Sequence, residues 1–574
     1  MLDRSEASRS EPTPAAEPPA RIGRRQFLTG ATAGMGGVAA ALAIAACAGP
    51  SGPAKLRARP TAHPKAHPKD LGVTKVTLAS GVTVPSARWL VEENQRTGTI
   101  GWVVTGIQTP HALEGYASQV SAKAGDEVTL FVNTAARSVQ MQAYRMGYYQ
   151  GLGGRLVFTS DTVAAKQQPA AAFAPGVNTV SCQWDPTLTF RVDSTWPPGN
   201  YLLKLVGDAG QQQYVPLTVR DDESTAAFVI QNSVSTWQAY NLWGGYSLYY
   251  GRTPTGGSDF ANRSRIVSFD RPYPQTWAQG AADFFGNEFP LLYHLESLGV
   301  DLTYWTDVDL HQRPELLARH QCLFSLGHDE YWSAPMRFGA QAALARGTNL
   351  AFLGANACYR QIRFQDSPVG PDRQQICYKS ATEDPMATQD PALTTVNWEQ
   401  SPVNLPESLL IGSMYQSVGS NDGLVVTDAG SWFFEGCGFQ EGQVLPNVVQ
   451  GEYDRYVPNF PGPTNVDVLA HSPVARQHNW SDITYYTASG GGGVFDSGMA
   501  SFVFKLSNTT AFPWNIVPKA IPGITDNLLR AMENLYGLFG NGPASATQPS
   551  TGNWTAAYEG SGAGAGSAQS TGTT

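Results

Sequence analysis

The chain has 574 residues and a formal charge of −9, and this charge is unevenly distributed. Residues 1–70 carry a net charge of +5, which leaves −14 for the rest of the chain. The body therefore lacks the basic surface that phosphate backbones require, and nucleic acid is excluded as a partner. Charged residues make up 15% of the chain and aromatic residues 11%, which excludes a disordered or fibrous protein.

Residues 1–47 are predicted to be an export signal. Arg24 and Arg25 precede a weakly apolar stretch rich in Gly and Ala, as in twin-arginine signals. The stretch ends in IAAC, which resembles a bacterial lipobox, so Cys47 is predicted to carry a lipid that attaches the protein to the membrane. An uncleaved membrane anchor is the alternative. Both interpretations place the body outside the cytoplasmic membrane, and the oligomeric state stays open.

The segments on either side of the body are predicted to lack a fold. Residues 48–72 form a spacer rich in Pro, Ala and Lys, and residues 541–574 form a low-complexity, disordered tail. Five cysteines follow Cys47, which is an odd number for an oxidising compartment. At least one of them is predicted to be free or to pair with another chain.

Residues 73–221 are predicted to form an Ig-like β-sandwich. Short alternating strands are separated by Gly- and Pro-rich turns, and no long helical pattern intervenes. The turn Trp196–Asn200 is a defined corner, because Pro presets φ and Gly permits a positive φ. The predicted strands are residues 128–134, 139–149, 155–160, 188–192, 201–207 and 212–220.

Residues 222–540 are predicted to form an α/β domain of three layers. Continuously apolar strands alternate with amphipathic helices, which is typical of a parallel sheet covered on both faces. The expected order is strand 226–231, helix 284–299, strand 300–306, strand 321–327, a helix after Ser333 and strand 349–355. Later strands up to residue 504 are expected to complete the same sheet, before a helix over residues 526–540. Residues 251–279 form a long insertion, which is often functional.

The turn SLGHDEYWS, residues 325–333, is the predicted active site. It contains no Ser or Cys at its centre, so it cannot supply the nucleophile of a covalent mechanism. His328 can move a proton near neutral pH, and Asp329 or Glu330 can orient it or act as a base. Tyr331 as a phenolate can bind a hard ion such as ferric iron. Alternatively, Asp329 and Glu330 are favourable acids of a first helical turn.

Other polar residues are expected at the same edge of the sheet. Tyr240 and Asn241 follow the first strand of the α/β domain and either reach the site or support a loop. Glu452 leaves a later strand and offers a further carboxylate. Asp307, Asp309 and His311 have the spacing of a metal clip, or else form a helix cap followed by a packing histidine. Cys322 and Cys358 are predicted to be core or disulfide cysteines.

Several stretches together resemble proteins similar to the large subunit of N,N-dimethylformamidase. The resemblance spans roughly residues 100–540 and is carried by YRMGYYQGLGGRLV, WPPGNYLLKLVG, TWQAYNLWGGYSLY, YWTDVDLH, LGHDEYWS, LAFLGANACYRQIRF and CYK. It implies a domain related to glutamine amidotransferases, in which ligands lie at the carboxyl ends of the strands. It also implies amide hydrolysis at a single iron held by two tyrosines and a glutamate.

The family's iron ligands are only partly matched in this sequence. Tyr331 corresponds to one tyrosine, and Tyr293 is a shifted substitute for the other. The segment LTTVNW has no acid where the glutamate is expected, so Glu452 is the candidate carboxylate. The resulting expectation is an exported hydrolase of an amide or related C–N bond, with iron as the candidate cofactor. The alternatives are a binding or scaffold protein without the metal, and metal-free acid–base chemistry, for instance on a glycoside.

Overall fold

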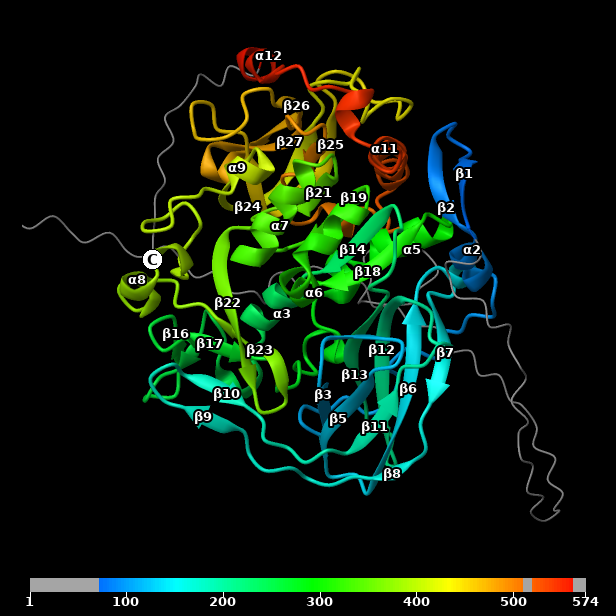
Figure 1. Cartoon of the computed structure of the whole chain (residues 1–574), viewed down its shortest axis with the longest axis vertical. Coiled ribbons are helices and arrows are strands. Elements are labelled where there is room, and N and C mark those ends of the chain that lie inside the picture. Colours follow the sequence, from blue (N-terminus) through cyan, green and yellow to red (C-terminus); the bar gives the residue numbers. More distant parts are fainter. Residues whose placement is uncertain (1–71, 509–518, 561–574) are drawn as a thin grey trace, which may run out of the picture. The chain divides into compact units, whose positions relative to one another are not determined.

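Most of the regular structure is β-sheet, arranged in several separate sheets with shorter helices between them (Figure 1). The computed structural model describes residues 72–508 and 519–560. Arg24, Arg25 and Cys47 lie outside these residues, as does the predicted linker up to residue 71. Within the two described ranges, no helix is both long enough and apolar enough to span a bilayer.

Two facing sheets form the β-sandwich, and the predicted strands agree closely with it. Alternate residues of the strands, such as Leu130, Met141 and Leu203, meet in one apolar core between the two sheets. The first sheet contains β3 (Leu113–Ala117), β5 (Glu127–Thr134) and β11 (Leu188–Arg191). The second contains β4 (Ser121–Lys123), β13 (Gln212–Arg220), β12 (Gly199–Gly207), β6 (Ser138–Met146) and β7 (Gly154–Thr159).

The second sheet of the sandwich is also buried on its outer face. Leu202 of β12 and Met146 of β6 belong to a core that continues into the following domain. Across this contact Arg145 forms a fully buried ion pair with Glu296, with 2.8 Å between Nη2 and Oε1. The predicted corner residue Trp196 is buried and stacks on Tyr201, with ring centroids 5.2 Å apart.

The first part of the predicted sandwich, residues 73–94, does not belong to it. β1 (Val73–Thr77) and β2 (Thr83–Ala87) form a separate hairpin, and α2 (Arg88–Asn94) follows it. Ser86 bridges to Val300, and the buried residue Leu90 joins the core of the later domain. The apolar face of this segment is therefore covered by helices and strands that come about 200 residues later in the sequence.

A seven-stranded sheet forms the centre of the second half of the chain. Its order is β18 (Leu302–Thr306), β14 (Phe228–Asn232), β19 (Cys322–Gly327), β21 (Asn349–Gly354), β28 (Gly493–Asp496), β27 (Asn479–Thr487) and β26 (Asp467–Val474). The first five strands are parallel to one another, and β27 runs antiparallel to both of its neighbours, β28 and β26. The carboxyl ends of the five parallel strands therefore share one edge, where ligands bind in such sheets.

Both faces of this central sheet are packed. Phe324 and Leu326 of β19 join the core that contains α5 (Phe289–Ser297) and α11 (Thr525–Phe539). Leu323 faces the opposite way and packs with Met336 of α7 (Ala334–Leu344). This explains why the strand reads as a continuous apolar run rather than an alternating one.

Three predictions about this region are wrong in part. Residues 284–299 form two helices, α4 (Phe284–Asn287) and α5, because Glu288 leaves helical geometry and Pro290 begins a new first turn. Residues 426–428 bond to Leu469 and Ala470 of the edge strand β26, but residues 424–425 and 448–455 do not join the central sheet. They belong to a separate hairpin of β24 (Met414–Val425) and β25 (Val444–Arg455), because the two strands pair with each other.

Residues 541–560 are ordered, although the sequence predicts a disordered tail. They include α12 (Trp554–Gly560), and Tyr558 inserts into the core beside β26 and β27. Two aromatic side chains give this segment enough apolar surface to pack. Residues 561–574 lie outside the described residues.

Every cysteine in the described ranges has a free, buried thiol. These are Cys182, Cys322, Cys358, Cys377 and Cys437. The prediction of at least one unpaired cysteine is therefore confirmed for the described part of the chain. Cys322 and Cys358 are core residues rather than disulfide partners.

Candidate functional site

Two glycines end neighbouring strands and place the predicted turn at the edge of the central sheet. Gly327 ends β19 with a φ of +59°, and it pairs with Gly354 at the end of β21. A Cβ atom on Gly327 would lie 2.4 Å from Cβ of Asn287, and one on Gly354 would lie 1.4 Å from the carbonyl oxygen of Gly327. Only glycine fits this close approach. His328 thus leaves the strand at a fixed point.

His328 lies between two carboxylates. Its Nε2 is 2.7 Å from Oε2 of Glu452 and 3.4 Å from Oε2 of Glu330, although the N–H direction is aligned with neither oxygen. Burial by itself lowers the pKa of His328, but the two carboxylates outweigh burial and raise this pKa to about 10. The imidazole is therefore protonated at neutral pH. The side chain is 10% exposed and that of Glu452 is 19% exposed, so both can meet a ligand.

Glu330 is buried and fully engaged by donors. Its carboxylate accepts hydrogen bonds from the hydroxyl of Tyr240 at 2.9 Å, the hydroxyl of Tyr249 at 2.7 Å and Nε of Arg360 at 2.9 Å. Burial alone would raise the pKa of Glu330, but the bond to His328 and the charges of Lys379 and Arg360 hold that pKa well below its usual value. Glu330 is thus the ionised centre that orders the other groups.

Tyr331 and Lys379 each carry a buried polar atom without a hydrogen-bond partner. The residue Tyr331 is 0% exposed, and its hydroxyl makes no hydrogen bond. Nζ of Lys379 lies 3.2 Å from the ring centroid of Tyr249 and 5.3 Å from that of Tyr331. Burial and the neighbouring Arg360 lower the pKa of Lys379 well below its usual value. The site therefore holds two donors that nothing in the described chain satisfies.

The loop that follows β21 positions Glu452. Nδ2 of Asn356 donates to Oε2 of Glu452 at 3.1 Å, and the backbone N–H of Asn356 donates to Asp454 at 2.8 Å. Asn356 has a φ of +58°, in the left-handed region that costs most residues roughly 1 kcal/mol or more. The loop after β21 thus fixes Glu452 against His328.

Asp329 lies under the site rather than in it. One of its oxygens accepts hydrogen bonds from Ser325 at 2.8 Å and from Gln231 at 2.9 Å. The same Nε2 of Gln231 donates to Asp307, and burial together with the charge on Asp329 raises the pKa of Asp307 well above its usual value. Burial raises the pKa of Asp329 to about 6. This carboxyl pair connects the ends of three strands and has no exposed atom for chemistry.

The remaining predicted residues divide between the site and its supports. Tyr240 reaches the site through Glu330, whereas the side chain of Asn241 donates to Gln238 and to the carbonyl of Pro272 and so supports a loop. Asp309 forms a capping box with Thr306. Nδ1 of His311 lies 2.8 Å from Oγ of Ser333. Residues 307–311 therefore form the predicted helix cap and not the metal clip.

The three predicted iron ligands do not come together. The ring of Tyr293 packs on Tyr148 at 5.2 Å and on Phe289 at 5.9 Å, in a core separate from the one that contains Tyr331. Glu452 faces His328. In the described ranges no group of three or more His, Cys, Asp or Glu side chains is arranged to hold a metal. The predicted set of Tyr331, Tyr293 and Glu452 therefore does not form the family's iron site.

Sequence reasoning missed Tyr249, Arg360 and Lys379. Tyr249 lies in the segment TWQAYNLWGGYSLY, Arg360 in LAFLGANACYRQIRF and Lys379 in CYK, which are all segments that carry the family resemblance. Arg360 begins β22 (Arg360–Ser367), and Lys379 follows β23 (Gly370–Ile376). The family resemblance therefore indicated these segments, but only the folded structure shows that Arg360 and Lys379 lie near Glu330.

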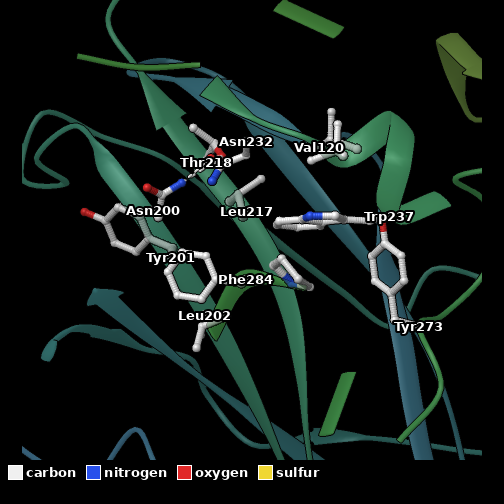
Figure 2. Close-up of a pocket in the computed structure, with 12 residues that line it drawn as sticks. Val120, Asn200, Tyr201, Leu202, Leu217, Thr218, Asn232, Trp237, Tyr273 and Phe284 are labelled. Atoms are coloured by element: carbon white, nitrogen blue, oxygen red, sulfur yellow. Dashed lines mark hydrogen bonds between the residues drawn. The ribbon is translucent and has the colours of Figure 1, made fainter. Parts of the chain in front are cut away.

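A small cavity lies away from these residues, between β12, β13 and the first turn of the next domain (Figure 2). Figure 2 shows Asn200, Thr218 and Asn232 together on one side of it and Trp237 and Tyr273 on another. Its volume is about 30 Å³, which suits one or two water molecules and no substrate. None of the predicted site residues lines it, so it is not the candidate site.

The fold and site define a protein with acid–base residues at the carboxyl edge of a mainly parallel sheet. Residues 140–512 match the family model described as N,N-dimethylformamidase beta subunit-like, C-terminal. This match covers more than half of the chain, and the chain belongs to that family. The family predicted from the sequence motifs is therefore confirmed.

Comparisons with individual proteins add little to this assignment. No curated protein matches the chain. A cycloisomaltooligosaccharide glucanotransferase of Paenibacillus sp., solved with cycloisomaltoheptaose, is 8% identical with a TM-score of 0.15, over 55% of this chain and 62% of that chain. A family 123 glycoside hydrolase from Clostridium perfringens is 9% identical with a TM-score of 0.10, over 44% of this chain and 69% of that chain. At these TM-scores neither likeness bears on the fold or the function.

Proposed function

We propose that this protein is a hydrolase of an amide or a related C–N bond and that His328 and Glu452 are its catalytic residues. The observation that carries the proposal is the partly exposed His328–Glu452 pair, 2.7 Å apart, at the carboxyl edge of the parallel strands. Membership of the dimethylformamidase-like family supports the bond type. Glu330 is excluded as the base because its oxygens already accept three hydrogen bonds from Tyr240, Tyr249 and Arg360.

The two residues divide the proton transfers of hydrolysis between them. Glu452, the more exposed carboxylate, takes a proton from a water molecule whose oxygen attacks the carbonyl carbon. The imidazolium of His328 donates a hydrogen bond to the carbonyl oxygen as negative charge develops there. The C–N bond then breaks, and the proton held by Glu452 passes to the departing nitrogen. The products are a carboxylic acid and an amine.

Hydrolysis of a panel of N-substituted amides by the full-length protein tests this proposal. We expect the Glu452→Gln and His328→Gln variants each to lose activity by about 100-fold or more, the usual contribution of acid–base groups. The Asp454→Asn variant is unsuitable as a control because Asp454 positions Asn356, so the exposed Glu127→Gln serves instead. Activity that survives in both site variants would contradict the assignment.

A non-catalytic binding protein is the second candidate. The observation that favours it is the separation of Tyr293 from Tyr331, because the predicted pair of tyrosine ligands is then not formed. In that case the wild type would turn over no amide of the panel while still binding a ligand at the His328–Glu452 pair. Calorimetric titration of the same panel separates the two functions.

The fold class and the location of the protein complete the proposal. We assign residues 113–220 to the Ig-like class and residues 222–540 to the glutamine-amidotransferase-like, three-layer α/β class, on the support of five parallel strands packed on both faces. We also infer export through Arg24 and Arg25 and a lipid anchor on Cys47. Replacement of both arginines by lysine should retain the protein in the cytoplasm, and Cys47→Ala should release it from the membrane fraction.

A further inference from the structure

Lys379 carries a buried amine without a counter-ion of its own. Its Nζ makes neither a hydrogen bond nor an ion pair with any described residue, and it lies on the face of the Tyr249 ring. The carboxylate of Glu330 is already occupied by other donors. An amine left without a partner in such a place costs a few kcal/mol, so it is expected to have a ligand.

Arg360 and Lys379 are connected through Tyr249 and Glu330. Nζ of Lys379 lies on the ring of Tyr249, whose hydroxyl donates to the carboxylate that also accepts from Nε of Arg360. Nη1 of Arg360 donates to Asn397, while Nη2 has no partner among the described residues. The side chain of Arg360 is 19% exposed. The two basic groups therefore lie near the same carboxylate, and each keeps a donor without a partner.

The hydroxyl of Tyr331 is a third donor in this place. It is buried and unpartnered, and Lys379 lies 5.3 Å from its ring centroid. Arg360 and protonated Lys379 offer only N–H donors, and the hydroxyl of Tyr331 offers an O–H donor besides its acceptor oxygen. Such a set matches a ligand that has only acceptor oxygens.

We propose that Lys379, Arg360 and Tyr331 bind a carboxylate of the substrate, which makes the substrate an amide that carries a negative charge. With Lys379 protonated, the site contains three positive groups, His328, Arg360 and Lys379, against the two carboxylates Glu330 and Glu452. A singly charged anion balances that set, and a planar carboxylate suits the guanidinium edge. An N-acyl amino acid is the chemical class that fits. This inference rests on the hydrolase function proposed above.

Binding of acetate and of its neutral isostere acetamide to the full-length protein tests the site without turnover. We expect acetate to bind about ten times more tightly than acetamide, because a charge-assisted contact is worth roughly 1.5 kcal/mol or more. The Lys379→Met variant should lose about this ten-fold preference, and Tyr331→Phe should lose a smaller part of it. Lys505→Met is the matched control, since Lys505 is a buried lysine that donates to Gln450 elsewhere.

Three results would overturn the proposal. The first is equal affinity of the wild type for acetate and acetamide. The second is an unchanged preference in Lys379→Met, provided that its thermal unfolding shows a folded protein. The third is a tyrosinate-to-iron absorbance band that appears on addition of ferric ion and is absent from Tyr331→Phe, because that result would assign the site to a cation.

Turnover separates this inference from the proposed function. N-acetylglycine should be hydrolysed with a KM about ten-fold lower than that of its methyl ester, again the value of one charge-assisted contact. Acetate binding without hydrolysis of any amide would reject the hydrolase and keep the anion site. Hydrolysis of both compounds with equal KM would keep the hydrolase and reject the anion site.

Discussion

Two of the histidine–carboxylate pairs in the described residues are similarly short and differ in what surrounds them. Nε2 of His328 lies 2.7 Å from Glu452, and both side chains reach solvent, with exposures of 10% and 19%. Nδ1 of His471 lies 2.6 Å from Asp482, and both side chains are 0% exposed. The first pair stands among further charged groups, whereas the second is enclosed by aromatic rings.

The second pair holds the end of the chain in place. The His471 ring stacks on Trp480 with centroids 4.0 Å apart, and Asp482 also accepts hydrogen bonds from the hydroxyl of Tyr558 and the backbone of Tyr456. All of these partners belong to β26, β27 or the segments that cover them. The comparison teaches that a short histidine–carboxylate distance does not identify a catalytic pair. Access to solvent and donors that remain unused make the distinction.

The largest effect should follow from breaking the enclosed pair. Asp482→Ala removes the acceptor of three donors and leaves His471 unpaired, so we expect a loss of about 3–5 kcal/mol in the free energy of unfolding. Denaturation in urea measures it. Asp185→Ala is the control, because Asp185 is exposed and its ion pair with Lys166 should contribute little. A change for Asp482→Ala no larger than that of the control would remove the distinction between the pairs.

Breaking the exposed pair should change activity more than stability. For Glu452→Gln we expect kcat to fall by about 100-fold while the free energy of unfolding falls by less than it does in Asp482→Ala, because the carboxylate is partly solvated. Steady-state kinetics and urea denaturation of the same preparation give both values. A stability loss as large as that of Asp482→Ala would make this pair structural as well.

The exposed pair should also make stability depend on alkaline pH. The pKa of His328 is about 10 in the folded protein, above the ordinary value of 6.5, because the neighbouring carboxylates outweigh burial. Its contribution to stability is therefore complete below about pH 6.5 and is lost as the pH rises through about 10. Unfolding free energies of the wild type and of His328→Gln, compared from pH 6 to pH 11, should converge at the alkaline end. A constant difference across this range would contradict the raised pKa.

The smallest expected effect concerns a single hydroxyl of the enclosed pair. Tyr558→Phe keeps the ring against His471 and removes only the donor to Asp482, so we expect a loss of about 1 kcal/mol in the free energy of unfolding. Differential scanning calorimetry resolves such a difference. An effect equal to that of Asp482→Ala would mean that the hydroxyl, rather than the carboxylate, holds α12 in place.

Local structure was predictable wherever the apolar pattern was strong. The predicted strand 212–220 coincides with β13, and the predicted strand 349–355 differs from β21 by one residue. Strand partners were less predictable, because the period of a strand says nothing about which strand it pairs with. The prediction for residues 448–457 was therefore correct about a strand and wrong about the sheet to which it belongs. The tail was misjudged because its Gly, Ala and Ser content masked the anchors Trp554 and Tyr558.

The site was predictable in its centre and not in its margins. His328 and Glu330 follow directly from the turn after an apolar strand, and Glu452 was inferred as a carboxylate at the same edge. Arg360 and Lys379 come from the two ends of a hairpin whose register the sequence does not specify. Tyr293 lies away from the predicted site because the helix that carries it faces the sandwich, where its ring packs on Tyr148.

The five reduced cysteines have a consequence for how the protein matures. Because each thiol in the described part of the chain is buried inside a packed core, the native state does not wait for an oxidant or a disulfide isomerase. The chain can complete its fold in a reducing cytoplasm. Oxidation after folding is hindered as well, because none of these thiols is exposed.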